Sequence, residues 1–100
     1  MKRSVDNLQL QRWRELDAAT VLVAIADHAK QDASFRERTA VGTTRWHAAA
    51  GGRDYELLCI GPKFFDTRAK VGGGGAVDLV MHLHDQNFKS AVRLLRDKGL

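Results

Sequence analysis

Two glycine-containing dipeptides constrain the middle of this sequence more than any other feature. Gly51-Gly52 and Gly61-Pro62 are strong turn signals, because glycine adopts positive φ without steric conflict and proline cannot donate a backbone hydrogen bond inside a strand. They separate three segments of strand-like composition at hairpin spacing, Arg45–Ala50, Arg53–Ile60 and Lys63–Thr67. The sequence therefore predicts an antiparallel meander of three strands, with four as the alternative.

The middle segment, Arg53–Ile60, is apolar on both sides of the predicted sheet. Successive strand residues point to opposite faces. One face would carry Tyr55, Leu57 and Cys59, and the other Glu56, Leu58 and Ile60. Because both faces hold apolar side chains, helices are expected to cover at least one of them.

Helical periodicity flanks the strands on both sides. Asp17 is expected to cap a helix that extends to about Lys30. Its apolar stripe repeats every three or four residues and consists of Val21, Leu22, Ile25, Ala26 and Ala29. Two further helices are expected from Ala76 to about His84 and from Asn87 to about Lys98, with Gly99 ending the second. The predicted fold class is α+β, a meander packed against helices.

The remaining segments are expected to be an arm, a connection and a loop. Residues 1–16 would form an amino-terminal arm or helix, and residues 17–100 a single domain. Gln31–Gly42 is polar and would connect the first domain helix to the strands, whereas Arg68–Gly75 would be a mobile loop. The apolar contacts expected here are Val5, Leu8, Trp13 and Leu16 in the arm, and Phe35 and Val41 in the connection.

Composition favours one domain in a reducing compartment. A chain of 100 residues with 44% hydrophobic residues and one proline can bury a core without cross-links. The single cysteine, Cys59, excludes a disulfide within the chain, which favours the cytoplasm. The most apolar run, residues 18–26, is too short to span a bilayer, and no apolar signal core follows Met1. A soluble, non-secreted protein without a membrane partner is expected.

Four consecutive glycines, Gly72 to Gly75, precede the helix expected at Ala76. A glycine backbone can approach a ligand closely, and a helix N-terminus attracts anions. The favoured alternative is that the glycines allow the connection before Ala76 to pack tightly, without a ligand. The run lacks both a Gly-x-Gly-x-x-Gly pattern and a Gly-Lys-Ser/Thr ending. Positive φ angles are then expected at Gly73 and Gly74.

The chain carries an excess of positive charge, with a net charge of +4 and a pI near 9.6. This balance favours a polyanionic partner. Between residues 45 and 70, cations are interleaved with aromatic rings, which is the combination that contacts phosphates and stacks on bases in single-stranded nucleic acid. Strand alternation requires about half of these rings to point inward. The candidate binding residues are Arg45, Trp46, Arg53, Tyr55, Lys63, Phe64, Arg68 and Lys70.

The second half of the chain resembles a replication module. The residues that carry the resemblance are Phe64-Phe65-Asp66, the glycine run, Ala76–Met81, and then Phe88, Ala91, Val92 and Leu95. They are similar to the second half of the zinc-binding domain of bacterial-type DNA primases. They are more similar still to its degenerate relatives in plasmid, phage and integrative-element primases. The resemblance covers Trp46–Leu95, and it implies an accessory, primase zinc-ribbon-like domain that helps a primase engage its single-stranded DNA template.

The sequence departs from that family at the metal ligands. The first ligand pair would fall at residues 44–47, where only His47 matches, and the second near Thr67 to Val71, where there is no cysteine. A structural zinc site needs four such ligands, so no metal and no cofactor are expected. A rearranged cluster of His47, Cys59, His82 and His84 is the less favoured alternative.

Catalysis is not expected of this chain. Asp78 and His82 have the i,i+4 spacing of an acid-base pair on one helix face, but no nucleophile motif and no acidic Toprim-type centre accompany them. The expected partners are single-stranded DNA and primase, helicase or relaxase components. The alternative function is a protein-interaction module, in which Leu8, Trp13 and the arm dock a helicase, a polymerase or a second copy of the chain.

Overall fold

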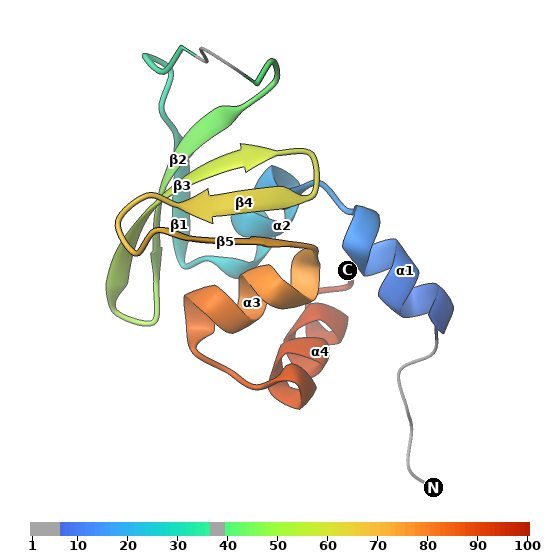
Figure 1. Cartoon of the computed structure of the whole chain (residues 1–100). Helices are drawn as coiled ribbons and strands as arrows, with labels where there is room; N and C mark the ends of the chain where they lie inside the picture. Colours follow the sequence, from blue (N-terminus) through green and yellow to red (C-terminus); the bar gives the residue numbers. More distant parts are fainter. Residues whose placement is uncertain (1–6, 37–39) are drawn as a thin grey trace, which may run out of the picture.

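The computed structural model describes residues 7–36 and 40–100, which form a five-stranded antiparallel sheet and four helices. In chain order the elements are α1 Asn7–Glu15, α2 Ala18–Ile25, β1 His28–Gln31, β2 Thr44–Ala50, β3 Arg53–Ile60, β4 Lys63–Asp66, β5 Val71–Gly74, α3 Ala76–His84 and α4 Phe88–Asp97. The strands pair in sequence order from β1 to β5. Figure 1 shows α3 and α4 below the sheet and α1 beside them.

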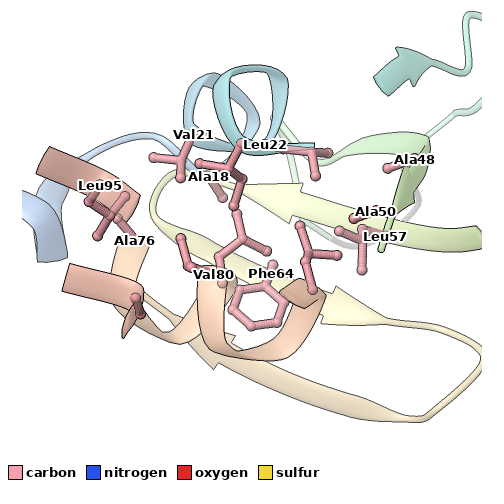
Figure 2. Packing of buried hydrophobic residues seen from close by; sticks show 14 of the residues in the cluster. Ala18, Val21, Leu22, Ala48, Ala50, Leu57, Phe64, Ala76, Val80 and Leu95 are labelled. Atoms are coloured by element: carbon pink, nitrogen blue, oxygen red, sulfur yellow. The ribbon is translucent and has the colours of Figure 1, made fainter. Parts of the chain in front are cut away.

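One face of the sheet is covered by helices and the other is not. Buried and more exposed residues alternate along β3, where Tyr55, Leu57 and Cys59 are buried. They pack with residues of α2 and α3 in one core; in Figure 2, Leu22 and Val80 approach from the two helices. In the described part of the chain, the side chains on the opposite face are half-buried or exposed. We call this opposite side the open face.

The predicted α+β class is confirmed, and β3 spans the residues predicted for the middle strand. The sheet has five strands, however, rather than three or four. The two additional strands, β1 and β5, lie at the two edges of the sheet. Each of these two strands replaces part of a predicted element, β1 the end of a helix and β5 part of a loop.

The strand β1 replaces the end of the helix that was predicted to reach Lys30. The helix ends at Ile25, Ala26 is extended, and the N–H of Asp27 donates to the carbonyl of Ala49 at 2.8 Å. The carboxylate of Asp27 also accepts the N–H of Gly51 at 3.2 Å. The predicted helical stripe ended in Ala26 and Ala29, which bury little apolar surface, so residues 28–31 pair with β2 instead of continuing the helix. Asp17 does precede α2, but its side chain makes no capping hydrogen bond.

The strand β5 replaces half of the predicted loop, from Val71 to Gly74. Gly73 pairs with Phe64, and a Cβ at Gly73 would lie 2.8 Å from the Phe64 ring. Positive φ was expected at Gly73 and Gly74, but in this run only Gly75 has it, with φ 93°. A Cβ at Gly75 would lie 3.4 Å from the Cα of Arg14 in α1. The glycine run therefore packs tightly against β4 and α1, as the favoured alternative predicted.

The amino-terminal helix belongs to the same core as the sheet. Trp13 of α1 is fully buried, and Leu16 packs against the core. The predicted contact at Leu8 is wrong, because this side chain is 79% exposed. The predicted anchor at Val41 is also wrong, since it is 88% exposed, whereas Phe35 is half-buried. Val5 lies outside the described residues. None of the described helices has the length and apolar character needed to cross a membrane.

Candidate nucleic-acid interface

The three predicted aromatic residues lie on the helix-covered face. Tyr55 and Phe64 are 9% and 5% exposed, and both rings lie 5.7 Å from the ring of His82 between centroids. The hydroxyl of Tyr55 donates to the carbonyl of Leu83 at 3.0 Å. Trp46 is half-buried against the core. The prediction that Tyr55 and Phe64 stack on bases is therefore incompatible with their burial.

The predicted cations are divided among separate places. Arg45 and Lys63 lie on the open face, because they pair with Leu58 and Ile60 in the strand register. Lys70, with φ 58°, is in the turn between β4 and β5. Arg53 and Arg68 line a hollow of about 350 Å³ on the other side of the sheet. The eight predicted residues do not form one surface.

Arg45 belongs to a polar network centred on Glu56. Its guanidinium forms an ion pair with the carboxylate of Glu56, and its Nε lies 3.7 Å from the carboxylate of Asp32. The hydroxyl of Thr67 donates to Glu56 Oε1 at 2.8 Å, and His47 Nε2 lies 3.6 Å from Asp32 Oδ2. The hydrogen bond from Thr67 and the contact with Arg45 lower the pKa of Glu56. This network compensates the charge of Arg45, which leaves it less available for phosphate.

A groove of about 580 Å³ lies on the open face beside this network. Its walls combine exposed apolar side chains with two cations. Phe65 is 41% exposed and Ile60 36% exposed, and Leu58 is paired with Phe65 across β3 and β4. The full lining is Phe35, Arg36, Ala40, Thr43, Leu58, Ile60, Lys63, Phe64, Phe65 and Gly73.

The two cations of the groove are placed differently. The guanidinium of Arg36 donates to the carbonyls of Ala33 and Phe35 at 3.0 and 3.1 Å, which holds it close to the Phe35 backbone. Lys63 is exposed and makes no ion pair with any described residue. Lys63 is therefore the one predicted site cation that lies in the groove.

Phe65 is the groove residue that the sequence prediction missed. Adjacent strand residues face opposite sides, so of Phe64 and Phe65 only one can be outside. The two-residue turn Gly61-Pro62 pairs Ile60 with Lys63 and hence Leu58 with Phe65. Hairpin register was the signal that could have selected Phe65 rather than Phe64.

The hollow lined by Arg53 and Arg68 contains a pair formed by the buried carboxylate of Asp66 and the half-buried imidazole of His82. Nε2 of His82 donates to Oδ2 of Asp66 at 2.7 Å, and Asp66 is 3% exposed. The other carboxylate oxygen accepts the N–H groups of Arg68 and Ala69, each at 3.0 Å. Burial acts to raise the pKa of Asp66, but the hydrogen bonds from Ala69, His82 and Arg68 outweigh it and the pKa is lowered. The carboxylate is fully engaged in holding the β4–β5 turn against α3.

The pair of Asp78 and His82 that the i,i+4 spacing allows is not formed. Asp78 accepts the N–H of Gly74 at 3.3 Å, so its carboxylate bonds the end of β5 instead of pairing with His82. His84 Nε2 donates to the carbonyl of Ile25 at 2.9 Å. Burial raises the pKa of Cys59 to about 12, with a smaller contribution from Asp17. The described residues include no group of three or more histidine, cysteine or acidic side chains arranged to hold a metal ion.

Comparison with known proteins gives one short similarity. A segment of 36 residues is 50% identical to part of a protein named "65 kDa protein" from Zymomonas mobilis subsp. mobilis. The segment covers 36% of this chain and 6% of the length of that protein. No protein-family model matches the chain, and no solved structure matches it. The similarity therefore assigns neither a family nor an activity.

Proposed function

We propose that this domain binds single-stranded DNA in the open-face groove and acts as a non-catalytic, template-engaging module of a DNA primase or of a mobile-element replication system. The observation that carries the proposal is the position of Phe65, an exposed ring in the wall of a groove that also contains Lys63. An exposed ring beside a cation provides both contacts that an unpaired nucleotide needs.

The groove suits a splayed nucleotide in size and chemistry. Its volume of about 580 Å³ lies within the range of small-molecule sites in proteins. Leu58 and Ile60 form an apolar floor beside Phe65, and Lys63 and Arg36 contribute the positive charge. Bases have apolar faces and an anionic backbone, so stacking and phosphate contacts would act together here.

The replication context is supported by the resemblance to the primase zinc-binding domain. When the sequence is aligned with that domain, the two pairs of zinc ligands fall near His47 and near Thr67. In this chain Thr67 bonds Glu56, which is paired with His47 in the strand register. A hydrogen-bonded network thus joins the two segments that zinc would join in the family, which fits a zinc-less relative.

Oligonucleotide titration tests the proposal with a matched pair of variants. Phe65→Ala removes the groove ring, whereas Phe88→Ala removes a ring of similar exposure, 47%, on α4. Stacking contributes about 1–3 kcal/mol per base, so Phe65→Ala should weaken binding of a short oligo(dT) by roughly 5-fold to 150-fold. Phe88→Ala should leave binding unchanged. Equal affinities for the two variants would contradict the groove assignment.

A second candidate function is protein docking through α1. Trp13 cannot contact a partner protein, because it is fully buried in the core. Leu8, which is 79% exposed, remains as an apolar contact for a helicase, a polymerase or a second copy. Docking of this kind depends weakly on salt, whereas phosphate binding weakens steeply as salt is added. Substitution Leu8→Ser should leave oligonucleotide affinity unchanged and weaken only protein docking.

A further inference from the structure

The positive charge of the chain is concentrated on two helices rather than on the sheet. Together α1 and α4 with its C-cap hold six cations and two carboxylates, Glu15 and Asp97. The rest of the chain holds ten cations and ten carboxylates, so the net charge of +4 comes entirely from these helices. The six cations are Arg12, Arg14, Lys89, Arg93, Arg96 and Lys98.

The two helices that carry these cations are in contact through one pair of side chains. Arg96 donates from Nε and Nη2 to Oε1 of Gln9 at 3.3 and 3.1 Å, which joins α4 to α1. Lys89 and Arg93 are exposed one helical turn apart, about 6 Å along the axis. We call the outer surface of these two helices, which carry the six cations, the helical basic face.

The charges of the helical basic face are not compensated within the described structure. None of its six cations forms an ion pair with a described residue. Lys89 and Arg93 have the i,i+4 spacing at which like charges destabilise a helix. An external anion would relieve this repulsion.

We propose that the helical basic face binds the phosphate backbone of duplex DNA, as a second contact beyond the single-strand groove. On α4, Lys89, Arg93 and Asp97 are exposed and charged, Phe88 at the first position is 47% exposed, and the apolar stripe Ala91, Val92 and Leu95 is buried. A membrane-binding helix would expose that stripe to lipid. The exposed cations Lys89 and Arg93, with Phe88 as the one exposed ring among the described residues of α4, are instead suited to a regular polyanion. Duplex DNA is such a polyanion, with about one negative charge per 1.7 Å of helix axis.

This second contact rests on the proposed nucleic-acid function but uses a different part of the molecule. The groove lies on the open face, whereas α4 packs on α3, whose buried side contributes to the core on the covered face. The groove offers a ring and discriminates in favour of unpaired bases. The helical basic face offers charge alone, so its binding should be independent of sequence and steeply dependent on salt.

Two charge-reversal variants test the inference. Lys89→Glu with Arg93→Glu alters the helical basic face, and Arg53→Glu with Arg68→Glu makes the same net change of four charges elsewhere. All four side chains are exposed, so melting curves should show both variants folded. Binding of a blunt duplex is measured at salt concentrations from low to physiological, with oligo(dT), polyglutamate and phosphatidylserine vesicles as parallel probes.

The helical variant should bind duplex more than 10-fold more weakly than the Arg53 and Arg68 variant, and its slope of log affinity against log salt should be shallower by about two. Equal losses of duplex affinity in the two variants would mean that the net charge of the whole protein, and not the helical basic face, attracts the duplex. That result would overturn the inference. Absence of duplex binding by the parent protein would also overturn it, as would tighter binding to polyglutamate or vesicles. If Phe65→Ala loses oligo(dT) binding but still binds duplex, both contacts are supported. If Phe65→Ala binds oligo(dT) as the parent does, the groove proposal is contradicted and the helical basic face is not.

Discussion

The carboxylate of Asp66 at the end of β4 lies 2.7 Å from Nε2 of His82 in α3, and its second oxygen accepts two backbone N–H groups of the following turn. One buried side chain thus fixes the β4–β5 turn and attaches it to the helix layer.

Stability should fall in acid through Asp66. Its pKa is lower in the folded protein than the ordinary value of 3.8, so the carboxylate stabilises the fold fully above about pH 5. That contribution is lost as the pH falls through 3.8 toward the lower folded pKa. Substitution Asp66→Asn should reduce the free energy of unfolding at pH 7 by about 2 kcal/mol and flatten this part of the acid dependence. Urea titrations at pH 3, 4 and 7 measure both the loss of stability and its pH dependence. If Asp66→Asn loses stability in acid as the parent does, Asp66 is not the source of that dependence.

The glycine run gives a prediction with an internal control. Gly73→Ala places a methyl group 2.8 Å from the buried Phe64 ring, and the overpacking should destabilise the domain by about 1–3 kcal/mol. Gly74→Ala meets nothing closer than Lys63 Cγ at 4.0 Å and should change stability little. Thermal melting of the two variants compares them directly. If Gly74→Ala were the more damaging, β5 would not have the register described.

The network around Glu56 should contribute to stability without metal. Glu56→Gln removes the ion pair with Arg45 and weakens the bond from Thr67. A loss of about 1 kcal/mol would lower Tm by about 4–8 °C in a domain of this size. The parent protein should melt at the same temperature with and without a chelator. Stoichiometric bound zinc, together with a melt that collapses in chelator, would contradict this account.

Side-chain patterns predicted those elements in which burial alternates clearly. The strand Arg53–Ile60 and the helix Ala76–His84 have the predicted bounds because burial alternates from Asp54 to Ile60 and the buried residues of the helix recur at its own period. Ala29 suits a helix and a strand equally, so its membership of β1 depends on pairing with Ala48, far along the chain. Gly72 and Gly73 have no side chain to alternate, which concealed β5.

The candidate site was predicted only in part for a related reason. Composition located the cations and rings between residues 45 and 70, and Lys63 does line the groove. Composition cannot tell which of two adjacent rings is buried, and that choice placed Phe64 inside and Phe65 outside. Nor could it show that Arg45 is paired with Glu56, since the two residues meet only across β2 and β3.

The central claim, that the open-face groove holds single-stranded DNA, is tested most directly by an NMR titration of the isotope-labelled domain with oligo(dT). The largest amide and side-chain shifts are expected at Leu58, Ile60, Lys63 and Phe65, and they should saturate with added oligonucleotide. Shifts confined to α1 and α4, or the absence of saturable shifts, would contradict it.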